Sequence, residues 1–389
     1  MIMRRLLKSF GLSLAAKPWR GLWEKPPQTV EKKRNLSRFG HIEINNAHKW
    51  ARFDGFKITP YMRDLMLYSG QEEIYGMASE QLEKYLRIRV DDSQINRLCV
   101  HYGEALDKQM EESEAEVVEA TEAFKSELAE GEVVYSMLDG TMLPTRPCQD
   151  PEGEIGSWKE MKLGRIFREG DRLDLGKAKP NVIRRSLHVS HFGKHEQFTE
   201  KLESVVDVFE SLGKNLVFVN DGATWIANWI QAHYPCATDI LDFYHAVEYL
   251  YSFAKAIYSS STQSHEIEQW VDRQIERLMQ DQVEAVIEEI AQMEFKGKTK
   301  LKEQEKILTY YQNNQHRMYY KTYRDRGLLI GSGPIESAHR FVLQKRMKLY
   351  GQKWTKKGAQ AVANLRVVHI NNQWQRVLNL INDQPKQAA

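Results

Sequence analysis

The sequence predicts an α/β protein whose mixed sheet is preceded by a helical region and followed by an all-helical block. Three observations support this prediction. Between residues 132 and 241, strand and helix patterns follow in the order strand, strand, strand, helix, strand, helix, strand. Residues 246–326 show almost only helical spacing, and so do residues 59–130. At 389 residues, the chain is long enough for two or three domains.

Composition narrows the class of protein. Hydrophobic residues make up 42% of the chain, which is enough to bury a core and excludes wholesale disorder. No apolar run approaches the roughly 18 residues of a membrane helix, so we expect no membrane partner. The N-terminus resembles a signal peptide, but Lys8 interrupts its apolar stretch. Three cysteines without a Cys-x-x-Cys pair exclude a zinc ribbon and a disulfide scaffold, and a cytoplasmic location is expected.

The net charge of +2 conceals a strong asymmetry along the chain. Residues 1–35 hold nine basic residues against two glutamates, and residues 321–357 hold ten against two acids. Residues 104–132 hold eleven acids against two lysines. One interpretation is a solvated acidic helix between ordinary basic surfaces, which charge alone favours. The other is a protein that binds a polyanion through its basic faces.

Residues 1–57 are basic and show little periodicity, and we interpret them as an N-terminal arm. Short helices then follow. Thr59 is a helix cap with Pro60 at the first helical position, and Ser69-Gly70 is expected to end this first helix. The second helix is predicted over residues 75–86.

The third helix is predicted to begin at Asp91-Asp92-Ser93 and to end at Gly103, after a short link typical of a helix-turn-helix. An acidic helix is then expected over residues 104–130. We therefore assign residues 58–130 to an α-helical, helix-turn-helix-like DNA-binding region with an acidic linker helix. A small structural bundle is the alternative. Side chains able to contact base edges or phosphates lie on the polar side of the third helix: Gln94, Asn96, Arg97 and His101.

Residues 131–245 are predicted to form the first part of an α/β core, because the hydrophobic period changes there from helical to alternating. The order of elements is typical of the ribonuclease H-like fold, lacking only its last helix. The predicted strands cover residues 132–138, 158–167, 186–192, 215–220 and 237–241, and the predicted helices cover residues 195–212 and 223–233.

The all-helical block covers residues 246–330, with expected breaks at residues 259–261 and 295–297. Residues 331–389 are expected to supply the final core helix and a C-terminal helix. These two helices are predicted over residues 335–350 and 355–381.

Three carboxylates stand out by their position. Asp139 ends the first predicted strand, Asp221 follows the fourth strand at a strand-to-helix turn, and Glu336 opens the final core helix. Each has an ordinary explanation, since Asp-Gly favours turns and a glutamate is favourable in a first helical turn. In an open α/β sheet, however, sites form outside the carboxyl ends of strands. Their joint placement on this order of elements predicts a catalytic trio.

Such a trio fits metal-dependent chemistry on phosphodiesters. Transfer through two metal ions about 4 Å apart requires hard oxygen ligands that bridge and flank both cations. We expect Asp139 to bridge two Mg²⁺ ions, with Asp221 and Glu336 as flanking ligands and with Mn²⁺ able to substitute.

These residues lie in segments that resemble the catalytic boxes of DDE transposases of bacterial insertion sequences. The segments are DGTML at residues 139–143, NDGATWIANWI at 220–230 and GSGPIESAHRFVLQKRMKLYGQKWT at 331–355. A fourth segment, LDFYHAVEYL, is similar to the Asp/Cys-x-x-His motif of the Mutator-like group, here Asp242 and His245. The likeness covers roughly residues 58–375.

The resemblance implies a ribonuclease H-like core that is split by an all-α insertion, residues 246–330. It favours the interpretation that Asp242 and His245 stabilise this insertion beside the site or contact DNA near the cleavage point, over a capping aspartate and a core histidine. It also favours DNA-backbone binding over a plain solvated face for the basic run after Glu336. That run comprises Arg340, Lys345, Arg346, Lys348, Lys353 and Trp354.

The leading hypothesis is a Mg²⁺-dependent transposase that binds terminal inverted repeats, hydrolyses a strand at the element end and transfers the 3′-hydroxyl into target DNA. We expect a homodimer or higher oligomer on double-stranded DNA, in the bacterial cytoplasm and nucleoid-associated when bound. The competing hypothesis is a catalytically inactive or repurposed relative that only binds DNA, which the presence of all three acids disfavours. A third is a ribonuclease H-like nuclease or junction resolvase that needs the same metals without strand transfer.

Overall fold

A computed structural model describes residues 32–37, 40–45, 58–112, 131–146, 158–173, 182–211, 215–258 and 264–382. The chain divides into two compact units, of which Asp64–Ile381 is one and Met1–Arg63 with Asn382–Ala389 is the other. In the smaller unit, β1 (Lys32–Ser37) pairs antiparallel with β2 (Gly40–Asn45), where the sequence analysis expected no regular element. The larger unit holds every candidate site residue.

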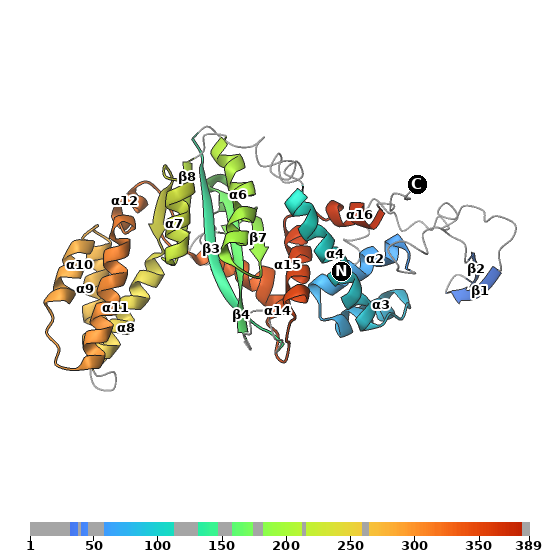
Figure 1. The fold of residues 1–389 in the computed structure, drawn as a ribbon, viewed down its shortest axis with the longest axis horizontal. Coiled ribbons are helices and arrows are strands. Elements are labelled where there is room, and N and C mark those ends of the chain that lie inside the picture. The colour runs from blue at the N-terminus through green and yellow to red at the C-terminus, as the bar shows by residue number, and fades with distance from the viewer. Residues whose placement is uncertain are drawn as a thin grey trace. The chain divides into compact units, whose positions relative to one another are not determined.

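The centre of the larger unit is a mixed sheet of five strands, in the order β7-β4-β3-β8-β9 (Figure 1). Antiparallel pairing joins β3 to β4 and β4 to β7, whereas β8 lies parallel to β3 and β9 parallel to β8. All five predicted strands and the mixed sheet are therefore confirmed. The strands are β3 (Val133–Pro144), β4 (Trp158–Arg168), β7 (Leu187–His191), β8 (Asn215–Asn220) and β9 (Thr238–Leu241).

The strand β3 does not end at the Asp-Gly pair as the sequence suggested. Asp139 pairs with Leu163 and Gly140 with Lys162 inside the β3–β4 ladder, which continues to Pro144. The parallel pairing with β8 does end nearby, at Met137 opposite Val219. The pairing partner β4 thus overrides the local turn tendency, and Asp139 lies just beyond the parallel part of the sheet.

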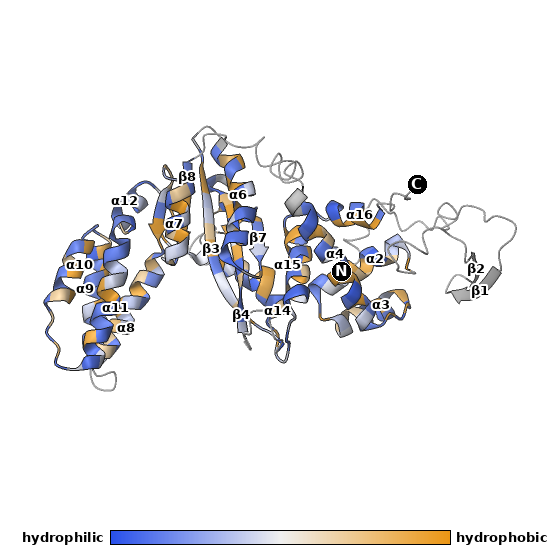
Figure 2. Ribbon diagram, in the orientation of Figure 1, coloured by the Kyte–Doolittle hydropathy of each residue, from blue (hydrophilic) through white to orange (hydrophobic). Residues whose placement is uncertain are grey.

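Helices cover both faces of the sheet, so this part of the chain has three layers. Helices α6 (His195–Ser211) and α7 (Thr224–His233) pack on one face through a buried apolar cluster that includes Val134, Phe198 and Phe218. Both helices are confirmed predictions. The other face carries α13 (Gly333–Ala338), the π-helical segment η5 (His339–Gln344) and α15 (Lys356–Ile370). Hydrophobic and hydrophilic residues alternate along α6 and α7, as expected of helices with one buried side (Figure 2).

A group of helices follows β9. The helical prediction for this block is confirmed over the described residues, as is its break near residues 295–297. A further break follows α9, where Asp281 has a φ of 60°. The predicted break at residues 259–261 lies outside the described residues. The helices are α8 (Phe243–Ile257), α9 (Ser264–Leu278), α10 (Val283–Gln292), α11 (Lys298–Asn314) and α12 (Tyr320–Asp325), with a 3₁₀ turn, η4 (Gln315–Arg317), before α12.

The N-terminal helices are α2 (Pro60–Glu72), α3 (Tyr75–Leu86) and α4 (Asp92–Glu112). The prediction for α3 is confirmed, but α2 continues past Gly70 and α4 past Gly103. The reason is close helix packing: a Cβ on Gly70 would lie 2.6 Å from Ile95 Cγ2, and one on Gly103 would lie 2.3 Å from the carbonyl oxygen of Ala361. These glycines let helices approach each other and do not end them. Residues 113–130 of the predicted acidic helix lie outside the described residues.

The C-terminal helices also differ from the prediction. The expected helix over residues 335–350 consists of α13, η5 and α14 (Lys345–Met347). The expected helix over residues 355–381 is two helices, α15 and α16 (Gln375–Asn382). They are separated where Asn371 donates from Nδ2 to the carbonyl oxygen of His188 at 3.0 Å and Asn372 adopts a φ of 59°.

Two short strands, β5 (Arg172–Leu173) and β6 (Val182–Ile183), form a small antiparallel pair after the 3₁₀ turn η3 (Glu169–Asp171). Across the described parts of the chain, no helix is long and apolar enough to span a membrane.

Candidate active site

Strand register brings two of the predicted carboxylates to the same face of the sheet. Met137 of β3 lies opposite Val219 of β8. Asp139 lies two residues further along β3, on the same face as Met137, and Asp221 is the first residue after β8, which ends at Asn220. Asp139 and Asp221 therefore project from neighbouring positions, toward the layer that holds α13.

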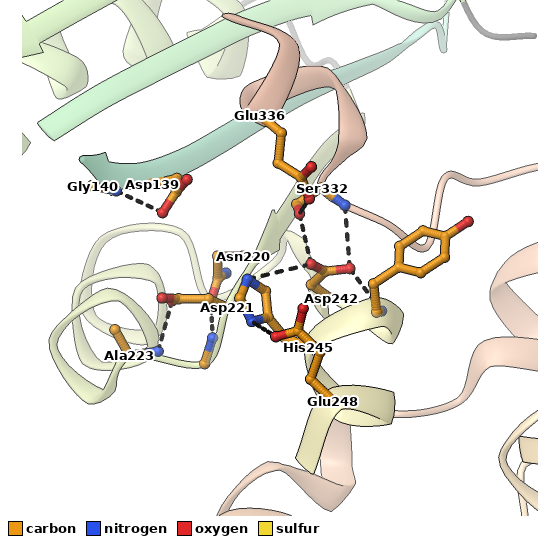
Figure 3. A network of polar contacts seen from close by, with 12 residues as sticks. Asp139, Gly140, Asn220, Asp221, Ala223, Asp242, His245, Glu248, Ser332 and Glu336 are labelled. Atoms are coloured by element: carbon orange, nitrogen blue, oxygen red, sulfur yellow. Dashed lines mark hydrogen bonds and ion pairs between the residues drawn. The ribbon is translucent and has the colours of Figure 1, made fainter. Parts of the chain in front are cut away.

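The third carboxylate comes from α13, which is fastened to this face by Arg165. The Nη1 of Arg165, on β4, donates to the carbonyl oxygen of Pro334 at 2.6 Å. Figure 3 shows the side chains of Asp139, Asp221 and Glu336 arriving from three different elements around one region. The structure thus brings the predicted trio together.

The electrostatics of Asp139 show how closely these groups interact. Burial first, and then the negative charges of Asp221 and Glu336, raise the pKa of Asp139 to about 6, against the lowering effect of the backbone N–H of Gly140 and the nearby His245. That N–H donates to Oδ1 of Asp139 at 2.7 Å. Among the described residues, no lysine or arginine forms an ion pair with any of the three acids. The site is a concentration of negative charge that the protein leaves largely uncompensated.

A histidine that the sequence analysis did not single out lies against this site. His339 places Nε2 at 3.3 Å from Oδ2 of Asp139. Burial lowers the pKa of His339 to about 4, so its imidazole is neutral at pH 7. His339 follows Glu336 by three residues, and residues at that spacing share one side of a helix. That spacing is the sequence signal that could have identified it.

Asp242 and Glu336 are connected through Ser332. The buried carboxylate of Asp242 caps α8 by accepting from the backbone N–H of Tyr244 at 3.0 Å. The hydroxyl of Ser332 donates to Asp242 at 2.6 Å and lies 3.4 Å from Oε1 of Glu336. Burial raises the pKa of Asp242, which the Ser332 hydroxyl opposes. Ser332 was missed, although it stands directly before the helix that carries Glu336.

His245 lies one helical turn after Asp242. Its Nε2 is 3.8 Å from Oδ2 of Asp242, and its Nδ1 is 3.4 Å from Oε2 of Glu248 (Figure 3). The effect of His245 on the pKa of Asp139 places the motif beside the carboxylates. The structure therefore brings both motif residues to the predicted trio.

The turn that presents Asp221 is fixed by a buried polar group below it. Asn220 accepts from the backbone N–H of Gly222 at 3.2 Å and from Nη2 of the buried Arg317 at 2.9 Å. Gly222 has a φ of 85°, which glycine adopts without strain. Arg317 also donates to Asp239 of β9 at 2.8 Å. No local sequence signal identifies Arg317, since it lies 97 residues after its partner.

The donor set suits a hard divalent cation. Carboxylate oxygens are the ligands that Mg²⁺ and Mn²⁺ prefer, and a cation supplies the positive charge that the three acids lack. Within the described ranges, no group of three or more His, Cys, Asp or Glu side chains is positioned to hold a metal ion. The three acids therefore fit Mg²⁺ by their chemistry and charge, but the structure does not hold them close enough together to form a metal site.

The DNA-binding candidates on α4 are all exposed: Gln94, Asn96, Arg97 and His101. The opposite side of this helix is buried, as the spacing predicted, and packs in part against α15 through Gly103. Arg97 donates from Nε to the carbonyl oxygen of Ser93 at 3.3 Å. The polar side of α4 is therefore exposed, on a helix that is anchored to the core.

The basic run after Glu336 separates into two groups. The exposed group comprises Arg340, Lys345, Lys348 and Lys353. Arg346 and Trp354 are buried: Arg346 donates to the carbonyl oxygen of Gly70 at 3.1 Å and stacks its guanidinium over Tyr75 and Trp354. This placement counts against a DNA-contacting role for Arg346 and Trp354.

Comparison with known proteins assigns no family. A scan of the chain against protein-family models finds no match, and neither does a search of curated proteins. Function is therefore inferred from the residues and geometry described above.

Proposed function

We propose that this chain is a DDE transposase that cleaves a DNA strand at the ends of a mobile element and joins the freed 3′-hydroxyl to target DNA. The observation that carries the proposal is the gathering of Asp139 from β3, Asp221 from the turn after β8 and Glu336 from α13, with a repulsion that helps to raise the pKa of Asp139. Acids that served only as turn formers or helix caps would not need to share one region.

The order of elements supports the same proposal. A ribonuclease H-like core needs its first strand in the centre of a mixed sheet, with two parallel strands on one side, and β3, β8 and β9 fulfil this requirement. The helices α8 to α12 lie in the chain between Asp221 and Glu336, where the resemblance implies an all-helical insertion.

Asp139, Asp221 and Glu336 are the residues that would hold two Mg²⁺ ions, which when bound activate the attacking oxygen and neutralise the leaving one. The chain's own residues hold these acids in place. Ser332 and the buried Asp242 fix the start of the Glu336 helix, and Asn220 fixes the turn of Asp221. Because Asp139 has the raised pKa, it gains most from a nearby positive charge.

DNA contact is assigned to exposed basic and polar groups outside the carboxylate site. The polar side of α4 would read the terminal inverted repeats, and the exposed members of the basic run would hold the phosphate backbone. Because Gly103 lets α4 pack directly against α15, the helix that would bind an element end would be held in a fixed position on the core. We extend the proposal to a homodimer or higher oligomer that acts on target DNA in the bacterial cytoplasm.

The test separates chemistry from binding in the variant Asp139→Asn. The substrate is a labelled element end taken from the DNA beside the reading frame, with strand nicking in Mg²⁺ measured alongside a gel shift. We expect nicking to fall by at least about a hundredfold, because the charge that holds the cations is lost, whereas binding persists. Asp272→Asn, at an exposed position on α9, is the matched control and should nick normally.

Two outcomes would contradict the proposal. Wild-type protein that binds the element end without Mg²⁺-dependent nicking would favour the alternative, a catalytically inactive DNA-binding relative. An Asp139→Asn protein that nicks as well as wild type would remove Asp139 from the chemistry.

A further inference from the structure

A cavity of about 1090 Å³ lies beside the carboxylate site, and its lining is basic where the site is acidic. Its wall contains five arginines and, among the described residues, no acidic side chain. The arginines are Arg165, Arg184, Arg185, Arg324 and Arg340. A wall of this composition is suited to an anion.

The charge of this wall is only partly balanced by the protein. Arg184 and Arg185 form ion pairs with Asp171, at 3.1 and 3.0 Å. Arg324 and Arg340 are exposed, and their side chains form no hydrogen bond or ion pair within the part of the chain that the structure describes.

Arg165 is buried and points its donors at neutral acceptors, the hydroxyl of Ser186 and the carbonyl oxygen of Pro334. Neutral acceptors do not cancel its charge, so Arg165 adds to the surplus. Several guanidinium groups therefore line one cavity. Asp171 forms ion pairs with two of these arginines, Arg184 and Arg185. Guanidinium groups in such an arrangement match phosphate oxygens in charge and in geometry.

An aromatic ring stands on the same wall. Tyr244 is 61% exposed, although one edge of its ring packs closely on Gly331, where an added Cβ would lie 2.6 Å from Cε2. A large ring that is held in place and exposed next to arginines is the combination that single-stranded nucleic acid requires, because bases stack on the ring while arginines hold the backbone.

The cavity adjoins the candidate active site through two elements. On α13 and η5, Pro334, Ser337 and Arg340 line the cavity, and Glu336 is the direct neighbour of Ser337. On α8, Tyr244 lies between Asp242 and His245, which belong to the carboxylate site. A strand that leaves the carboxylates on this side would meet the arginines and the ring within a few nucleotides.

We propose that this cavity binds a short unpaired segment of DNA next to the cleavage point, with Arg324 and Arg340 holding phosphates and Tyr244 stacking on a base. The inference rests on the proposed function for its ligand class and deepens it, since it requires the element end to be locally unpaired. Bases inside a duplex are stacked on their neighbours and cannot offer a face to Tyr244.

The test measures binding by the full chain in EDTA, so that it does not depend on catalysis. The probe is a fluorescein-labelled twelve-nucleotide oligo-dT, compared with a duplex of the same length. We expect Tyr244→Ala to weaken single-strand binding by about tenfold and to change duplex binding less than twofold. Tyr244→Phe keeps the ring and should bind within about twofold of wild type.

The arginines are tested in the double variant Arg324→Ala with Arg340→Ala. It should lose about tenfold in single-strand affinity and reduce the slope of log affinity against log salt by about 1.4, for two phosphate contacts. Lys302→Ala, at an exposed position on α11, is the charge control. It should change neither the single-strand affinity nor the salt slope. A 5-iododeoxyuridine in the oligonucleotide should crosslink to Tyr244.

Equal weakening of single-strand and duplex binding would overturn the inference, as would Tyr244→Ala binding that matches wild type or crosslinks found only elsewhere. Failure of Mg²⁺-dependent nicking would leave these EDTA measurements unaffected, so the two proposals fail separately.

Discussion

The two faces of the central sheet are built from alternate residues of the same strands, yet they differ in kind. The face under α6 and α7 buries an apolar cluster, to which β3 and β8 contribute Val134 and Phe218. The face under α13, η5 and α15 buries ionisable groups, including Arg165, His188 and His339. A single sheet thus carries its apolar cluster on one face and its buried ionisable groups on the other.

The two faces differ in the free energy of burying their side chains. Burying apolar surface is favourable, whereas burying a polar group is unfavourable unless it is hydrogen-bonded. On the polar face, Arg165 finds Pro334 and His188 finds Asn371 as partners. Asp139 instead faces further acids. The destabilised group on this face is the one we assign to catalysis.

The largest effect is expected from the apolar face. Phe218 is fully buried, with the rings of Trp229 and Tyr234 beside it. Phe218→Ala should lower the free energy of unfolding by about 3–5 kcal/mol, because it leaves a cavity in the core. Urea unfolding measures this change. A loss below about 1 kcal/mol would mean that this face is not the stabilising one.

The polar face should instead make stability depend on pH. Burial lowers the pKa of His188 to about 3, so the folded protein keeps it neutral while the unfolded chain takes up a proton below about pH 6.5. The free energy of unfolding therefore decreases as the pH falls from about 6.5 toward 3. Between pH 6.5 and 4 the loss from His188 should be about 3 kcal/mol. His188→Gln should remove that part of the slope in urea unfolding, and an unchanged slope would contradict the assignment.

A smaller effect of opposite sign is expected at Asp139. A folded-state pKa of about 6 means that the charged form is disfavoured, so stability falls as the pH rises from about 4 to 6. In EDTA at pH 7.5, Asp139→Asn should therefore raise the free energy of unfolding by about 2 kcal/mol. Adding Mg²⁺ should raise the melting temperature of the wild type more than that of the variant. A destabilised variant would show that Asp139 serves the fold.

The smallest effect is expected on the exposed basic run. Lys348→Ala should change the free energy of unfolding by less than about 0.5 kcal/mol. It should weaken binding to all DNA sequences alike and reduce the salt slope of duplex binding by about 0.9, as the loss of one phosphate contact does. Gel shifts at several salt concentrations measure the slope. A sequence-dependent loss would instead indicate that Lys348 reads bases.

The strands and the flanking helices were predictable because each leaves a local signal, and so was the position of each acid beside its strand or helix. The apolar run of β8 and the turn after it, for example, place Asp221 without reference to any other segment. The helix ends predicted at Gly70 and Gly103 were wrong, because each glycine lies against a residue of another helix that is distant in the sequence. Local sequence cannot distinguish a glycine that ends a helix from one that admits a neighbour.

The same limit applies to the basic run and to the support of the site. Arg346 and Lys348 are two residues apart, and only tertiary packing decides that the first is buried and the second exposed. Arg317 and Ser332 act on residues that are 97 and 90 positions away. Their roles follow from the fold and could not be read from spacing.

The most direct test of the central claim, that three acids form one catalytic centre, compares nicking by single and triple variants in Mg²⁺. The single variants are Asp139→Asn, Asp221→Asn and Glu336→Gln. Because residues that act as a unit are not additive, each single variant should nick as slowly as the triple variant. Single variants whose separate losses multiply to give the triple loss, or one that nicks like the wild type, would contradict a shared centre.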